Sequence, residues 1–200
     1  MLEDFARDIA ALLDELSVTN IVLCGLSMGG QIVLEFYRLF PHRVRALILS
    51  DTFAQLDSDA RRQERYDTAE RLLREGMDDY AAEVLPKMIT PKTIREQPEV
   101  AEHVLTMMRT TSPAGAAAAL RGRAERQDYT PLLPEIMVPT LIVVGSDDEF
   151  TPISDAEFMH QRIPNSKMVV IDATGHMPNL ENPDEFNRVV TEFAETLALS

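Results

Sequence analysis

A serine between two glycines is the first group in this 200-residue chain that could do chemistry. The segment Gly25-Leu26-Ser27-Met28-Gly29 follows the short apolar run 21–24 and opens an amphipathic run. A sharp turn from strand to helix exposes such a serine as a nucleophile, and flanking glycines relieve the clash where the two elements nearly touch. We therefore predict that Ser27 is a nucleophile and that Gly25 and Gly29 are the glycines its turn requires.

An acid and a histidine follow two further apolar runs. Asp147 and Asp148 come after the run 140–144, and His176 comes after the run 168–171. In an open parallel sheet, reactive groups gather in the loops just past the carboxyl ends of the strands. The order serine, acid, histidine along the chain is that of a hydrolytic triad built on such a sheet.

With these motifs the chain resembles the α/β-hydrolase superfamily, and is most similar to its 3-oxoadipate enol-lactonase and esterase members, which have a helical cap. The motifs are the serine turn, the Gly-x-x-Asp-x-x-x-Pro segment from Gly145 to Pro152, and His176 preceded by a glycine ahead of a final helix. In that family the acid usually lies three residues after the glycine that ends its strand. The resemblance thus implies the triad Ser27, Asp148 and His176, with Asp147 as the fallback acid.

A third acid, Asp51, stands at the end of the second apolar run. A minority of the family places the triad acid at this position. The interpretation that we favour is structural, with Asp51 capping or shaping the hinge that leads to the cap.

The resemblance implies a serine hydrolase that acts on a small-molecule carboxylic ester or lactone through an acyl-enzyme. His176, oriented by Asp148, takes the proton from Ser27, and water then repeats the attack. The backbone N–H of Met28 is the expected oxyanion donor. No metal and no cofactor is expected. A cofactor-free perhydrolase or haloperoxidase-like enzyme shares the same triad and is an alternative.

Short apolar runs alternate with helical patterns at both ends of the chain. This alternation predicts an α/β fold with a mostly parallel sheet and helices on both faces. Residues 1–55 and 127–200 are predicted to form the two parts of the core, and 56–126 a helical cap insertion of about four short helices. The predicted strands are 21–24, 44–49, 140–144 and 168–171, and the predicted core helices begin near residues 2, 28, 155 and 183.

The serine turn lies close to Met1, whereas related enzymes have several strands before it and a His-Gly loop that supplies the second oxyanion donor. No histidine of this chain is followed by glycine. The strand at 21–24 is therefore expected to be an exposed apolar edge. Three interpretations follow: a hydrolase that omits its amino-terminal segment, which we favour; a chain that completes its sheet with another chain, including a homodimer; and a catalytically silent binding module.

The composition of the chain limits the classes of partner and the cellular location that we expect. The net charge of −14 argues against nucleic acid or an anionic membrane surface as a partner. No apolar run approaches the length of a spanning helix, and the first residues lack the pattern of a signal peptide, so a cytoplasmic location is expected. The single cysteine, Cys24, lies within the first apolar run and is expected to be buried and to have no chemical role.

Overall fold

The computed structural model describes residues 1–198. The chain divides into two compact units: a helical unit over residues 56–127, and an α/β unit formed by residues 2–55 together with the chain from residue 128 onward. Within the described residues no helix combines the length and the apolarity needed to cross a membrane.

The α/β unit is built on a four-stranded sheet in the order β1-β2-β3-β4, with every neighbouring pair parallel. The register places Leu26 of β1 beside Ser50 of β2, and Gly145 of β3 beside Ile171 of β4, so the carboxyl ends of the strands lie along one edge. All four strands begin or end within two residues of the predicted runs. Their bounds are β1 (Ile21–Leu26), β2 (Val44–Ser50), β3 (Thr140–Gly145) and β4 (Ser166–Ile171).

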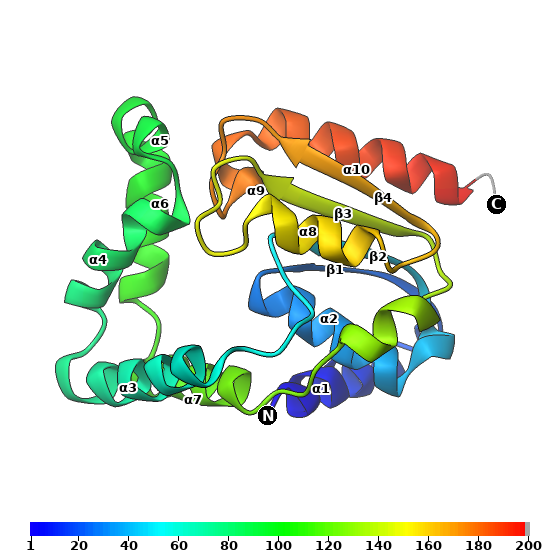
Figure 1. Ribbon diagram of the computed structural model, residues 1–200, viewed down its shortest axis with the longest axis horizontal. Coiled ribbons are helices and arrows are strands. Elements are labelled where there is room, and N and C mark those ends of the chain that lie inside the picture. The colour runs from blue at the N-terminus through cyan, green and yellow to red at the C-terminus, as the bar shows by residue number, and fades with distance from the viewer. Residues whose placement is uncertain (199–200) are drawn as a thin grey trace. The chain divides into compact units, whose positions relative to one another are not determined.

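Helices cover both faces of this sheet (Figure 1). Alternate side chains of β2 and β3 enter two separate cores, Leu47 and Ile142 one of them and Ile48 and Leu141 the other. The first core is closed by α1 (Leu2–Glu15), α2 (Met28–Leu39) and α8 (Ile153–His160), and the second by α10 (Pro183–Ala198). The predicted fold class, a parallel sheet with helices on both faces, is therefore confirmed.

Short elements link these layers. They are the 3₁₀ helices η1 (Pro41–Arg43) and η2 (Thr130–Glu135) and the four-residue helix α9 (Pro178–Glu181). The start of α10 is capped, because the Asn182 side chain accepts a hydrogen bond from the Glu185 N–H at 3.3 Å and Pro183 occupies the first helical position.

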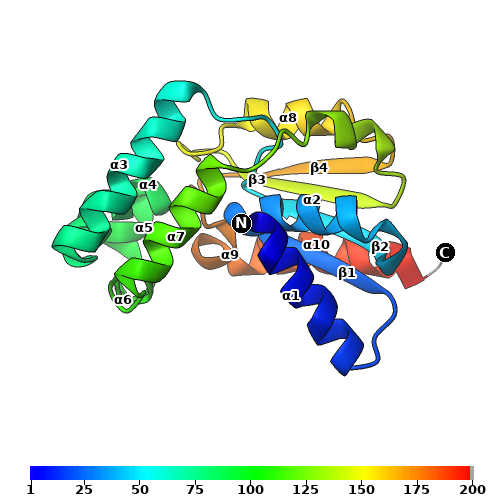
Figure 2. The same ribbon diagram turned by 90° about the horizontal axis from the view of Figure 1, so that it is seen from below.

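The helical unit contains five helices, where about four were expected: α3 (Asp59–Glu75), α4 (Asp78–Met88), α5 (Pro91–Glu96), α6 (Pro98–Arg109) and α7 (Pro113–Ala124). Proline occupies the first position of α5, α6 and α7, where its missing N–H has no helical acceptor to lose. Gly76, at φ 80°, ends α3. Helices α3 and α7 lie side by side in both ribbon views (Figures 1 and 2).

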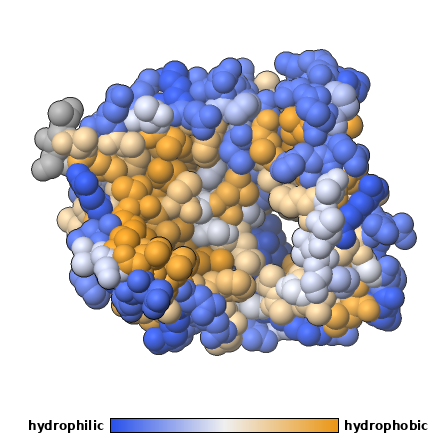
Figure 3. Space-filling model, turned by 180° about the vertical axis from the view of Figure 1, so that it is seen from behind, coloured by the Kyte–Doolittle hydropathy of each residue, from blue (hydrophilic) through white to orange (hydrophobic). Residues whose placement is uncertain are grey.

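Strand β1 is an edge of the sheet, as expected. Its side chains Val22 and Cys24 are exposed, and the view from behind shows a broad apolar surface (Figure 3). The prediction that Cys24 is buried was therefore wrong. The reason is that an apolar run is buried on both faces only in an interior strand, such as β3, whereas among the described residues β1 has a neighbouring strand on one side alone.

Candidate active site

Ser27 occupies the single residue between β1 and α2. Its φ of 55° and ψ of −116° place a non-glycine residue in the left-handed half of backbone space, which is strained. The end of β2 holds this turn: the Ser27 N–H donates to the Ser50 carbonyl at 2.9 Å, and the Thr52 hydroxyl donates to the Ser27 carbonyl at 2.7 Å. Two hydrogen bonds, one from the last residue of β2 and one from the loop that follows it, thus hold the strained turn in place.

The structure bears out the predicted steric need for one glycine of the turn, Gly25, but not for the other, Gly29. A Cβ on Gly25 would lie 2.3 Å from the backbone of Gly29, so Gly25 is needed where strand and helix nearly touch. A Cβ on Gly29 would meet nothing within 4 Å, so the expected steric need for Gly29 itself is wrong. The second glycine that the packing demands is Gly30, because a Cβ there would lie 2.5 Å from the Thr52 side chain.

Asp148 and His176 form a hydrogen-bonded pair at the carboxyl ends of β3 and β4. The distance from Asp148 Oδ2 to His176 Nδ1 is 2.8 Å, and both residues are buried. Asp147, the fallback acid, is exposed, and its backbone N–H donates to the Thr174 carbonyl. Of the two neighbouring acids, the one that contacts the histidine is Asp148.

Several donors hold Asp148 in its ionised form. Its Oδ1 accepts from the backbone N–H groups of Phe150 at 2.8 Å and Thr151 at 3.1 Å, and its Oδ2 accepts from the Thr151 hydroxyl. Burial alone would raise the pKa of Asp148, but His176 and Thr151 outweigh it and the net shift is downward. Thr151 was missed at the sequence level. An aspartate side chain that accepts from the backbone two residues on, as Asp148 does from Phe150, is a known turn motif, and it brings Thr151 close to the carboxylate. Phe150 stacks edge-on against the His176 ring at 5.1 Å.

Asp51 lies in the same group, which we call the carboxylate–histidine cluster: Asp51, Asp148 and His176. One potential ligand atom from each of the three lies within 4.8 Å of the others. Asp51 Oδ1 accepts from the Gly145 N–H at 2.9 Å, and the Ser50 hydroxyl contacts Asp51 Oδ2 at 2.6 Å. The favoured structural interpretation had placed Asp51 at the hinge; the structure brings it beside the acid and the histidine. Adjacent parallel strands β2 and β3 cause this, since they end side by side.

The two acids of the cluster are pushed apart in pKa. Burial, and then the negative charge of Asp148, raise the pKa of Asp51 to about 8, against the opposing hydrogen bonds from Ser50 and Gly145. Two carboxylates this close cannot both ionise cheaply, so one keeps its proton while the other carries the charge. At neutral pH Asp148 is the charged member, and Asp51 is mostly a neutral acid.

The amino end of α2 supplies the remaining expected group. Met28 is the first residue of this helix, so its backbone N–H has no acceptor within the helix and lies at the positive end of the helix dipole. Such an N–H, next to a candidate nucleophile, can stabilise a developing oxyanion. In chemical terms the edge of the sheet offers a strained serine, a buried acid–histidine pair and a helix amino terminus.

Comparison with known proteins agrees with this fold. A sequence model for the family described as alpha/beta hydrolase fold matches residues 2–183. The chain is 30% identical over 189 residues to 3-oxoadipate enol-lactonase 2 of Acinetobacter baylyi, an alignment that covers 94% of this chain and 69% of the relative.

Solved structures agree with that similarity. A malate-bound thermophilic esterase from Thermogutta terrifontis superposes with a TM-score of 0.96 at 39% identity, over 98% of this chain and 73% of the esterase. The enol-lactonase from Burkholderia xenovorans LB400 superposes with a TM-score of 0.89 at 26% identity, over 98% of this chain and 73% of the lactonase.

Proposed function

The chain belongs to the alpha/beta hydrolase fold family and is a hydrolase of the esterase and lactonase kind, and on this premise we propose that it cleaves a carboxylic ester or lactone through a Ser27–His176–Asp148 triad and an acyl-enzyme. The observation that carries the proposal is the 2.8 Å contact between Asp148 Oδ2 and His176 Nδ1. In this proposal the helical unit corresponds to the cap insertion of the family.

In this proposal the contact supports Nε2 of His176 as the base. With Nδ1–H donated to Asp148, Nε2 of His176 carries the lone pair and faces away from the acid. The charge on Asp148 stabilises the imidazolium that forms when Nε2 takes a proton. A low pKa for Asp148 keeps that charge in place through the cycle.

In the acylation step, His176 Nε2 takes the proton of the Ser27 hydroxyl as its oxygen attacks the substrate carbonyl carbon. The carbonyl oxygen becomes an oxyanion, which accepts a hydrogen bond from the Met28 N–H. Collapse of this intermediate breaks the ester bond, and His176 returns the proton to the departing alkoxide. Water then attacks the acyl-enzyme with the same base, and the acid product leaves.

The test is covalent labelling of the serine. A fluorophosphonate probe should label the wild-type chain stoichiometrically, with Ser27 identified by peptide mass spectrometry. Ser27→Ala should abolish labelling, and His176→Ala should reduce it strongly, because the probe needs an activated hydroxyl. Ser154→Ala, an exposed serine on α8, is the matched control and should label like wild type. Labelling that persists in Ser27→Ala would disprove the nucleophile assignment.

The exposed edge of β1 favours a second, compatible proposal, that this strand pairs with a strand of another copy and that the chain acts as a homodimer. An unpaired edge offers a row of free backbone donors and acceptors to such a partner. Light scattering over a range of protein concentrations tests this. A dimer that strengthens with concentration and is lost when Val22 is replaced by lysine supports edge pairing, and a monomer at every concentration excludes it.

A further inference from the structure

The loop that carries His176 makes a strained turn between β4 and α9. It spans residues 172–177, and Ala173 within it has a φ of 56°. A left-handed conformation costs a non-glycine residue free energy and persists only where the surroundings hold it. One contact that holds this turn comes from the residue that follows β3, because the Ala173 N–H donates to the Ser146 hydroxyl at 2.8 Å.

The backbone of Gly175, the residue just before the histidine, lies close to two other residues. A Cβ on Gly145, the last residue of β3, would be 2.1 Å from the Gly175 carbonyl oxygen, so the approach needs a glycine at position 145. The Gly175 N–H donates to Oε1 of Glu181, the last residue of α9, at 2.6 Å. The second half of the loop is thus held from both the sheet and the short helix.

The contact with Glu181 is buried, and it closes a short stretch of chain that contains the histidine. Both Gly175 and Glu181 are buried, and a buried N–H without an acceptor costs about 1–3 kcal/mol. Loss of the glutamate oxygen would therefore favour a different orientation of the peptide that leads into His176. The contact from His176 Nδ1 to Asp148 Oδ2 is 2.8 Å long, and such bonds extend only to about 3.2 Å. A shift of the loop by a few tenths of an ångström is enough to weaken that contact.

We propose that Glu181 is a positioning residue for the base: it holds the peptide before His176 so that Nδ1 stays on Asp148 and Nε2 stays available to the reacting hydroxyl. The inference rests on the proposed function, in which His176 is the base. Glu181 acts through the loop and has no contact with substrate in this role. The contact requires an acceptor oxygen and no particular charge, so an amide oxygen at the same place should serve.

The first readout is the tautomer of His176, measured by ¹⁵N NMR of the full chain labelled on histidine, in buffer where the ring is neutral. The signals are assigned by their loss in His176→Gln. The partner of each ring nitrogen sets the tautomer, so wild type and Glu181→Gln should show the Nδ1-protonated form alone. Glu181→Met has a side chain of similar length without the acceptor and should show a mixture of both tautomers. Should Glu181→Met fail to fold, Glu181→Asp, which withdraws the carboxyl by one methylene, is the second variant and should also show the mixture.

The second readout is the hydrolysis of a p-nitrophenyl ester. Glu181→Met should lower kcat by about 10²-fold, the usual cost of a reacting group displaced by about 1 Å. KM should not change, because the residue does not bind substrate. Glu181→Gln should keep most of the wild-type kcat, which a role that depends on charge would not allow.

Glu185→Met is the matched control. Glu185 lies in the first turn of the next helix, and its side chain accepts from Arg188 Nε at 2.8 Å on the surface. This variant removes the same group four residues further on and should keep both the wild-type tautomer and the wild-type kcat.

Three results would overturn the proposal: mixed tautomers in the wild type, an unchanged tautomer in Glu181→Met, or equal losses in Glu181→Gln and Glu181→Met. Failure of the proposed function gives a different pattern. The wild type would then show the single Nδ1-protonated form and respond to Glu181→Met, yet neither hydrolyse esters nor label at Ser27.

Discussion

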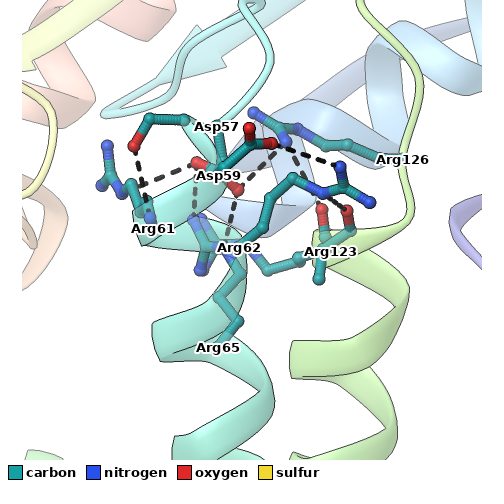
Figure 4. A network of polar contacts seen from close by, with 9 residues as sticks. Asp57, Asp59, Arg61, Arg62, Arg65, Arg123 and Arg126 are labelled. Carbon is teal, nitrogen blue, oxygen red and sulfur yellow. Dashed lines mark hydrogen bonds and ion pairs between the residues drawn. The ribbon is translucent and has the colours of Figure 1, made fainter.

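The two units of the molecule each bury a group of charges, and the two groups have opposite excess. The carboxylate–histidine cluster of the α/β unit holds two acids and one histidine. In the helical unit, Arg61, Arg65 and Arg126 surround the carboxylate of Asp57 (Figure 4), and we call these four residues the arginine cluster. Each lies where strand ends or helix ends from distant parts of the chain meet. The fold therefore creates the same electrostatic problem twice, with the sign reversed.

The two clusters relieve their excess by different chemistry. Asp51 takes up a proton, since a carboxyl pKa of about 8 leaves it mostly neutral at pH 7. Arginines do not lose their protons at that pH, and the balance is instead kept by Asp57: burial would raise its pKa, but Arg65, Arg126 and Arg61 outweigh burial and hold that pKa below its usual value. The acidic cluster is thus relieved by a proton on one of its acids, whereas the basic cluster keeps its one acid ionised.

The largest expected effect distinguishes the roles of the two acids in the carboxylate–histidine cluster. Asp148→Asn should reduce kcat for a p-nitrophenyl ester by roughly 10⁴-fold, because the histidine loses its charged partner. Asp51→Asn removes no charge at pH 7 and should leave kcat within about tenfold of wild type. Equal losses in the two variants would show that the acids share the role, and a greater loss in Asp51→Asn would reverse the assignment.

The next test removes the one acid of the arginine cluster. Asp57→Asn leaves the guanidinium groups without their carboxylate and should lower the free energy of unfolding by about 3–5 kcal/mol, measured by urea denaturation. Asp59→Asn is the matched control, because that side chain is fully exposed and its contact with Arg62 is a long one of 3.7 Å. It removes one charge from the first turn of α3 and should lower the unfolding midpoint far less than Asp57→Asn. If both variants behave alike, the buried ion pair contributes nothing to stability.

A third test uses pH to read the proton on Asp51. The ordinary pKa of this acid is 3.8 and its folded pKa is about 8, so between these values the folded protein holds a proton that the unfolded chain has released. Asp51 therefore makes stability fall as pH rises through this window. The difference in the free energy of unfolding, Asp51→Asn minus wild type, should therefore increase by at most about 1.4 kcal/mol per pH unit from pH 4 to 8. A constant difference would mean that Asp51 is ionised in the folded state.

The smallest expected effect comes from a glycine substitution at the serine turn, which changes no charge and so serves as a reference for the stability measurements above. Gly29→Ala adds a methyl group where nothing lies within 4 Å, inside the first turn of α2, and should stabilise the chain by about 0.5–1 kcal/mol. Gly25→Ala instead forces a Cβ to 2.3 Å from the Gly29 backbone and should be strongly destabilising. Comparable unfolding midpoints for the two variants would contradict the close approach of strand and helix.

The sequence predicted the parts of the site that depend on local order. Short apolar runs, each followed by a polar loop, predict strands with their reactive groups at one edge, and this places Ser27, Asp148 and His176 at three such strand ends. The choice of Asp148 over Asp147 came from the resemblance to the α/β-hydrolase superfamily, in which the acid usually lies three residues after the glycine that ends its strand. The contact at 2.8 Å with His176 agrees with that choice.

What the sequence could not predict depends on which strands and helices become neighbours. Asp51 approaches Asp148 because β2 and β3 are adjacent, and nothing in the residues between them states that adjacency. The same holds for Arg65 and Arg126, which meet at Asp57 only because α3 packs on α7. The need for Gly30 arises from contact with Thr52 beyond the end of β2, which again is a long-range fact.

The exposed thiol on strand β1 allows the accessibility of that edge to be measured by chemical labelling. Cys24 is the only cysteine in the sequence, so a maleimide fluorophore or spin label attaches at one known point. Desolvation raises the pKa of this thiol, so the reaction should be slow at neutral pH and accelerate in mild alkali. Any strand that docks along β1 would shield the sulfur. The rate of labelling would then report the fraction of molecules in which the β1 edge is uncovered.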